Sequence, residues 1–192
     1  MKYLSLFLLA GILFAGCSSS ADSGPVVPNT DIDPKFENNI STLFGHGSKN
    51  VNNKASDIIW KDSLGRLDSL SGATKNGEIV LLNFWATWCT PCNDELPDLK
   101  EVADSMTQFG VRVIGVSVDY GSNIWDFVKF DVDKFKLPYQ IVIDPKYTTY
   151  QNYGGDGSIP RSYIIDRNGN IRFVFVGQGT KADFIDRLWE LL

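Results

Sequence analysis

Two of the three cysteines in this 192-residue sequence lie three positions apart, in the segment Cys89-Thr90-Pro91-Cys92. A Cys-x-x-Cys pair carries out reversible dithiol–disulfide chemistry, binds a metal ion, or simply closes a small structural loop. A zinc site of this type needs a second pair of cysteine or histidine ligands. The sequence offers only Cys17 and the single histidine, His46. We therefore expect redox chemistry, with no metal and no cofactor.

The residues around the pair indicate how one of these thiols becomes reactive. An apolar run from Ile79 to Trp85 comes shortly before it and is typical of a strand buried on both faces. Pro91 suits the first turn of a helix, where a missing N–H costs nothing. Helix residues three apart are neighbours, and the N-terminal dipole lowers the pKa of the first thiol. We expect Cys89 to be the exposed attacking thiolate and Cys92 to resolve the mixed disulfide.

The elements that must position this pair follow from the apolar pattern. The pattern predicts a hairpin within residues 58–70, helices over 91–109, 123–135 and 146–153, strands over 79–85, 111–118 and 141–143, a second hairpin of 162–166 with 171–176, and a final helix after Thr180. The dipeptide Asn168-Gly169 is a strong hairpin turn signal, and Asn123 is a candidate N-cap. Alternating strands and helices predict an α/β fold with a central mixed sheet flanked by helices.

The N-terminal residues have the pattern of a secretory signal. Leu4 to Phe14 is an apolar run of about 11 residues, whereas a membrane-spanning helix needs about 20. Small residues precede Cys17, which is similar to the lipobox of bacterial lipoproteins. The resemblance implies a signal peptide over residues 1–16, cleavage before Cys17 and diacylation of its sulfur. The alternative is an ordinary signal peptide followed by a chance cysteine.

Residues 17–54 predict a lipidated tether. Ser18 to Thr30 is rich in Ser, Pro, Gly and Asp and lacks periodicity, a composition that buries no core. The residues Phe36, Ile40, Leu43 and Phe44 have rough helical spacing and could dock on the globular domain. We place that domain at residues 55–192.

The motif and its surroundings resemble the TlpA/ResA-type branch of the thioredoxin superfamily. The resemblance rests on Leu82 to Cys92, Glu95, Pro97, Gly115 to Asp119, Ile143-Asp144-Pro145, Ser158-Ile159-Pro160, Tyr163 to Asp166 and Asn168-Gly169. It covers about residues 57–192. It implies an exported, membrane-tethered thiol-disulfide oxidoreductase with a thioredoxin-like fold, in which an extra strand and helix are inserted at about residues 139–153.

The resemblance also implies how substrates are bound. It implies a cis peptide bond before Pro160 that faces the cysteines, although from the residues alone this bond could equally be trans. The backbone of Ile159 could then pair with an extended substrate segment beside the disulfide. Trp88, Thr90 and Pro91 are expected to contact substrate as well.

An acidic residue near the pair is a candidate for proton transfer. Glu95 lies three residues beyond Cys92 on the same helical face, and the resemblance implies that it tunes the titration of the cysteines. A half-buried carboxylate there could accept the proton of Cys92. The alternative is a solvated glutamate that stabilises the first helical turns. Asn83 stands where ordinary thioredoxins carry a buried acid, and Arg161 stands where Thr is common.

The expected function is reduction of disulfides in envelope proteins. The domain would lie in the periplasm or another extracytoplasmic space of a bacterial envelope, held to the membrane by lipid on Cys17 and supplied with electrons by a membrane thiol-disulfide carrier. The alternatives are a net disulfide oxidant, a peroxiredoxin-like peroxidase and, more remotely, a binding module with a vestigial pair. The net charge is −5 and no Lys/Arg-rich stretch occurs, so nucleic acid is not an expected partner.

Overall fold

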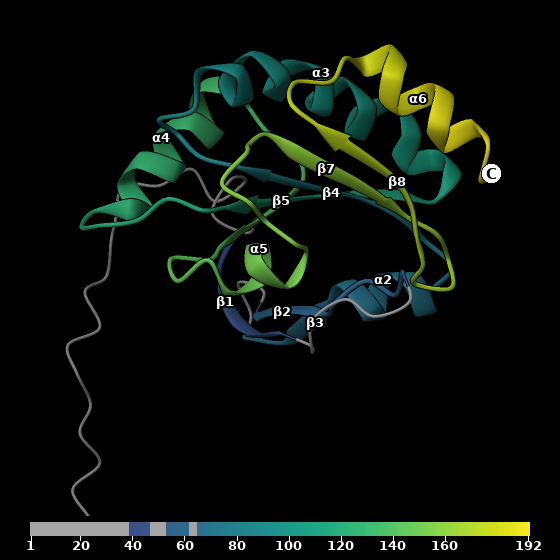
Figure 1. The fold of residues 1–192 in the computed structure, drawn as a ribbon, viewed down its shortest axis with the longest axis horizontal. Coiled ribbons are helices and arrows are strands. Elements are labelled where there is room, and N and C mark those ends of the chain that lie inside the picture. The colour runs from purple at the N-terminus through teal and green to yellow at the C-terminus, as the bar shows by residue number, and fades with distance from the viewer. Residues whose placement is uncertain (1–38, 47–52, 62–64) are drawn as a thin grey trace, which may run out of the picture. The chain divides into compact units, whose positions relative to one another are not determined.

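The computed structural model describes residues 39–46, 53–61 and 65–192 (Figure 1). The predicted signal peptide, Cys17 and most of the predicted tether lie outside these residues. None of the helices in the described ranges combines the length and the apolar character needed to cross a bilayer.

Among the described residues, eight strands form one mixed sheet in the order β3-β2-β1-β6-β5-β4-β7-β8. Their bounds are β1 Ile40–His46, β2 Ile58–Lys61, β3 Leu67–Ser69, β4 Ile79–Trp85, β5 Val111–Ser117, β6 Gln140–Ile143, β7 Arg161–Ile165 and β8 Ile171–Val176. The predicted hairpins β2–β3 and β7–β8 are both antiparallel pairs, as expected. The mixed α/β fold predicted from the sequence is therefore confirmed.

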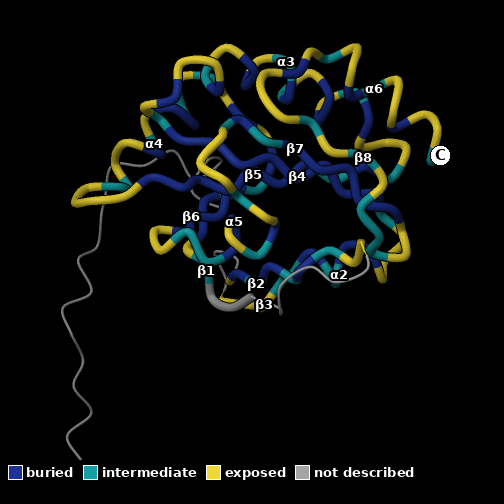
Figure 2. Tube along the Cα trace, viewed as in Figure 1, coloured by how far each residue is buried: buried dark blue, intermediate teal, exposed yellow. Residues whose placement is uncertain are grey.

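Strand β4 lies inside this sheet and is buried along its whole length (Figure 2). It runs parallel to β5, with Asn83 opposite Gly115, and antiparallel to β7, with Asn83 opposite Ser162. The near-continuous apolar run at this position thus predicted the burial correctly. Because both edges of β4 are paired, its carboxyl end has little freedom, and that end leads to the cysteine pair.

Helices cover both faces of this part of the sheet. Their bounds are α2 Leu70–Lys75, α3 Thr90–Met106, α4 Ile124–Phe135, α5 Thr148–Asn152 and α6 Lys181–Trp189. The helices α3, α4 and α6 lie on one face, and α2 and α5 lie on the other (Figure 1). Strand β6 and helix α5 form the strand–helix insertion that the family resemblance implied.

The helix starts predicted at Asn123 and Thr180 differ in outcome. Thr180 begins α6 with a capping box, in which its hydroxyl accepts the N–H of Asp183 and the Asp183 carboxylate accepts the N–H of Thr180. Asn123 precedes α4 as expected, but its side chain makes no capping hydrogen bond. The expected capping bond is wrong because Asn123 has a φ of 60°, a left-handed conformation that asparagine tolerates.

The segment that contains Ile40 and Leu43 is a strand, so the helical spacing expected there is wrong. Strand β1 pairs antiparallel with β2, at Leu43 and Trp60, and parallel with β6, at Ile40 and Ile141. The sheet therefore includes residues before 55, the predicted start of the domain. Pairing on both sides satisfies the backbone groups of β1 and outweighs a weak local side-chain pattern.

Gly115 is a position where the sheet leaves no room for a side chain. A Cβ atom there would lie 2.7 Å from Cδ1 of Ile141, 3.2 Å from Nε1 of Trp85 and 3.3 Å from Cε2 of Tyr139. We expect Gly115→Ala to lower the free energy of unfolding by about 1–3 kcal/mol, measured by urea denaturation, because the core must shift to admit it.

The Ile141→Val variant provides the control because it removes the nearest clashing atom, Cδ1. In the double variant, the loss of stability should be smaller than the sum of the two single losses. A Gly115→Ala protein as stable as the parent would show that the packing is looser than described.

Candidate active site

Cys89 and Cys92 form a disulfide at the N-terminus of α3, with an S–S distance of 2.02 Å and a Cα–Cα distance of 5.2 Å. Cys89 is the N-cap residue, and its Sγ accepts the backbone N–H of Cys92 at 3.3 Å. Pro91 lies in the first turn, as the sequence predicted. In the reduced protein this N–H and the helix dipole would favour a negative charge on Cys89.

The two cysteines differ in exposure less than expected. Cys89 is 5% exposed and Cys92 is 1% exposed. Their order agrees with an outer attacking thiol and an inner resolving thiol, but Cys89 in this oxidised form is not open to solvent as predicted. The residues beside it in the sequence, Trp88, Thr90 and Pro91, are all exposed. These three side chains are accessible next to Cys89, and their contact with substrate stays a prediction.

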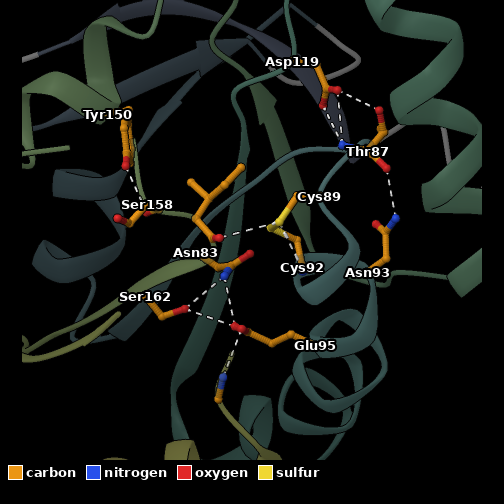
Figure 3. Close-up of a disulfide and its surroundings, with 12 residues drawn as sticks. Asn83, Thr87, Cys89, Cys92, Asn93, Glu95, Asp119, Tyr150, Ser158 and Ser162 are labelled. Atoms are coloured by element: carbon orange, nitrogen blue, oxygen red, sulfur yellow. Dashed lines mark hydrogen bonds between the residues drawn. A yellow bond between two sulfur atoms is a disulfide. The ribbon is translucent and has the colours of Figure 1, made fainter. Parts of the chain in front are cut away.

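The loop before β7 lies against the disulfide. The peptide bond between Ile159 and Pro160 is cis, and the carbonyl oxygen of Ile159 lies 3.7 Å from Sγ of Cys89 (Figure 3). The cis bond that faces the cysteines, which the family resemblance implied, is thus present. A reduced Cys89 thiol could donate to this carbonyl at a similar distance. The pairing of Ile159 with a substrate backbone stays a prediction.

Glu95 lies on the inner face of α3 and is 1% exposed. Its Oε1 accepts hydrogen bonds from Nδ2 of Asn83 at 3.1 Å and from the hydroxyl of Ser162 at 3.4 Å. Its Oε2 accepts the backbone N–H of Gly179 at 3.1 Å (Figure 3). This burial excludes the alternative of a solvated glutamate at the helix start.

The environment of Glu95 suits proton exchange near neutral pH. Burial raises its pKa to about 7, and nearby Asp98 adds a small increase, while the hydrogen bonds from Gly179 and Ser162 oppose the shift. A carboxyl group with a pKa near 7 can take up and release a proton under neutral conditions. No hydrogen bond joins Glu95 to either cysteine in the part of the chain that the structure describes, so its role as proton acceptor for Cys92 stays a prediction.

Sequence reasoning identified Glu95 but missed its partners Ser162 and Gly179. They lie 67 and 84 positions from Glu95 in the sequence. Only the antiparallel pairing of β7 with β4 and the approach of the loop before α6 bring them together. No local sequence signal marks either residue.

A second missed residue, Asp119, anchors the loop before the cysteines. Its buried carboxylate accepts hydrogen bonds from the N–H and the hydroxyl of Thr87 (Figure 3). It also accepts one from the hydroxyl of Ser117. Asn93 of α3 donates to the carbonyl of Thr87 at 2.9 Å. These bonds tie the β4–α3 loop to the end of β5 and to the helix that follows. The available signal was an acid directly after a buried strand.

The guanidinium of Arg161, which stands where Thr is common, is bound to groups of the protein itself. Nη1 of Arg161 lies 3.2 Å from Oδ1 of Asp156 and 3.3 Å from the carbonyl oxygen of Gly154. The Arg161 side chain is 14% exposed. We therefore assign it to holding the loop before Pro160 rather than to attracting substrate.

The raised pKa of Glu95 predicts that stability falls as pH rises. The unfolded chain releases this proton near pH 4.5 and the folded protein near pH 7, so the folded state binds more protons between these values. The contribution of Glu95 to the free energy of unfolding is fully present below pH 4.5 and falls by about 3 kcal/mol by pH 8. We expect Glu95→Gln to remove this part of the decline, measured by urea unfolding of the oxidised protein at several pH values.

Asp94→Asn is the matched control, because Asp94 is an exposed carboxylate on the same helix. It should leave the decline between pH 4.5 and 8 as steep as in the parent. An equally steep decline in Glu95→Gln would show that Glu95 does not titrate in this range.

Comparisons with known proteins agree with this geometry. Residues 51–174 match the AhpC/TSA family. Thiol-disulfide oxidoreductase ResA of Geobacillus thermodenitrificans is 34% identical over 138 residues, which cover 72% of this chain and 76% of that protein. Thioredoxin-like protein YneN of Bacillus subtilis is 33% identical over 142 residues, and the match covers 70% of this chain and 76% of that protein.

A solved structure is similar as well. The crystal structure of a putative thiol:disulfide interchange protein DsbE from Chlorobium tepidum aligns with a TM-score of 0.64 and 28% identity, and covers 75% of this chain and 99% of that one. The fold, the disulfide at the start of α3 and these relatives lead to one conclusion. The chain belongs to the AhpC/TSA family and is a thioredoxin-like thiol-disulfide oxidoreductase.

Proposed function

We propose that this protein reduces disulfides of exported envelope proteins while a lipid on Cys17 holds it at a membrane. The observation that carries the proposal is the Cys89–Cys92 disulfide at the N-terminus of α3, with the Ile159 carbonyl beside it. Dithiol exchange with a polypeptide requires an outer and an inner sulfur, a helix that stabilises a thiolate, and a backbone carbonyl next to the reacting atom.

The exchange proceeds in two steps. The Cys89 thiolate attacks one sulfur of the substrate disulfide and forms a mixed disulfide, and the other substrate sulfur leaves as a thiolate that takes a proton from water. Cys92 then loses its proton to Glu95 and attacks Sγ of Cys89, which releases the second substrate thiolate. The protein is left oxidised and the substrate gains two electrons. A dithiol of a membrane carrier returns the protein to its reduced form.

The position of Glu95 supports net reduction over net oxidation. A disulfide is strongly oxidising when its reduced form is stabilised, as happens when the thiolate is favoured. Glu95 is buried on the inner face of α3, one turn beyond Cys92. Once ionised, it disfavours a second negative charge on Cys92 and so favours the disulfide over the dithiolate. This makes the dithiol a better electron donor.

Export and anchoring rest on the N-terminal sequence. If Cys17 carries lipid, the active-site pair is the only thiol pair left in the chain. A protein that works outside the cytoplasm then has no spare thiol to form unwanted disulfides. The expected partners are disulfide-containing envelope proteins and the membrane carrier.

The Cys92→Ser variant tests the reaction with polypeptides. It should accumulate mixed disulfides through Cys89, because the resolving thiol is missing, and these appear as reductant-sensitive bands on non-reducing gels of envelope extracts. Cys89→Ser is the control, since it leaves only the more deeply buried thiol and should trap almost nothing. The proposal fails if Cys92→Ser captures no envelope protein, or if both variants capture the same amount.

The tether is tested separately by Cys17→Ser. We expect the parent protein in the membrane fraction and the variant in the soluble fraction of the envelope, because the loss of the acyl chains removes about 0.8 kcal/mol of membrane affinity per buried CH₂. Ser18→Ala serves as the control and should stay in the membrane fraction. Equal distribution of Cys17→Ser and parent would rule out lipid anchoring at this residue.

A further inference from the structure

Three aromatic side chains form a continuous surface at the carboxyl ends of the parallel strands β4, β5 and β6. They are Trp88, Tyr120 and Tyr147, which we call the aromatic ledge. The ring centroids of Trp88 and Tyr120 are 6.3 Å apart, and those of Tyr120 and Tyr147 are 6.0 Å apart. Trp88 is 58% exposed and Tyr120 is 66% exposed, while Tyr147 is partly exposed. The ledge begins at the residue directly before Cys89.

The first half of the ledge is held by hydrogen bonds to a buried carboxylate. The carboxylate of Asp119 accepts hydrogen bonds from the N–H and the hydroxyl of Thr87. Tyr120 follows Asp119 and Trp88 follows Thr87, so these bonds bring the two rings side by side. Asp119 is 3% exposed, so its carboxylate is shielded from solvent. The two rings are thus positioned by the same bonds that position the cysteine loop.

The second half is held by an unusual backbone conformation. Tyr147 has a φ of 58°, which a bulky residue adopts rarely and at a cost. The carbonyl of Asp144 accepts the N–H of Tyr147, and its carboxylate accepts the N–H groups of Thr148 and Thr149. These bonds stabilise the turn from which the Tyr147 ring contacts Tyr120 while also packing against the core.

The shape of the ledge fits an extended polypeptide. Side chains at alternate positions of a strand project to one side about 6.6 Å apart, close to the spacing of these rings. Beside Cys89, the Ile159 carbonyl offers a backbone acceptor to the same chain. Aromatic faces gain most from contact with apolar and aromatic side chains.

We propose that the aromatic ledge selects the substrate: it binds apolar side chains at alternate positions of an extended segment that flanks the substrate cysteine. Tyr120 and Tyr147 are then specificity-determining residues of the exchange reaction. This inference rests on the proposed reduction of polypeptide disulfides, and it narrows the substrates to segments that expose apolar residues near their cysteines, as incompletely folded proteins do.

Two symmetric peptide dimers, each joined through its single cysteine, test the proposal. One peptide carries phenylalanine two residues before and two residues after the cysteine, and the other carries serine there. Each dimer takes two electrons and two protons from the Cys89–Cys92 dithiol and leaves as two thiol peptides. The pre-reduced protein is mixed with each dimer, the reaction is quenched with acid, and chromatography of the products gives a second-order rate constant.

The parent should reduce the phenylalanine dimer roughly tenfold faster than the serine dimer. In the Tyr120→Ala/Tyr147→Ala double variant, this preference should fall to about twofold. Tyr120→Phe retains the ring and should keep the preference of the parent. Phe109→Ala is the matched control: Phe109 is 42% exposed and contacts Trp189 beyond the far end of α3. It should keep the full preference.

The outcomes separate this inference from the function it rests on. Equal rates for both dimers in the parent, or an unchanged preference in the double variant, would overturn the role of the ledge and leave the reductase intact. A parent that reduces neither dimer would remove the proposed function and the inference with it. Thermal unfolding of the double variant is recorded alongside. Because Tyr120 is exposed, the single variant Tyr120→Ala should fold normally and lose part of the preference, so it tests the ledge even if the double variant is unstable.

Discussion

The burial of β4 on both faces is the constraint on which the rest of the site depends. Each of its seven residues is buried, and its neighbours β5 and β7 pair along both edges. The chain leaves the sheet at Trp85 and reaches Cys89 through a loop fixed by the Thr87–Asp119 bonds and by a hydrogen bond from the N–H of Cys89 to the carbonyl of Ala86. The disulfide therefore has a defined position before any partner arrives, which reduces the entropy lost when a substrate binds.

The same constraint determines which groups face Glu95. Because α3 starts at Thr90 and packs over the sheet, its inner face places Glu95 above Asn83 and Ser162. An acid in place of Asn83 would face Glu95 as a like charge. An amide avoids this repulsion and can present either its N–H or its oxygen, so it can pair with the carboxyl group in both protonation states. A buried carboxylate is thus tolerated on the helix because the strand beneath it is neutral.

The elements that the sequence predicted well are those whose signals are local. The apolar run of β4, the Asn168-Gly169 turn and the helix start at Thr180 each depend on neighbouring residues, and the structure agrees with all three. The prediction for the segment of β1 was wrong because this segment pairs with β2 and β6, and those pairings depend on residues far away in the sequence. The spacing of its apolar residues resembled that of a helix only weakly and pointed to the wrong type of element.

In the active site, too, the features that depend on neighbouring residues were predicted and those that depend on distant segments were not. The cysteine pair, Pro91 and Glu95 belong to one helix, and their spacing alone placed them together. The limited exposure of Cys89 was not visible from that spacing, because it depends on the Ile159 loop lying against the disulfide. The helix N-terminus favours negative charge at Cys89, whereas an ionised Glu95 opposes it at Cys92. In the proposed reaction, one helix would thus make the outer sulfur the better nucleophile and place Glu95 as the proposed acceptor of the inner thiol's proton, which would give two chemically similar thiols different roles.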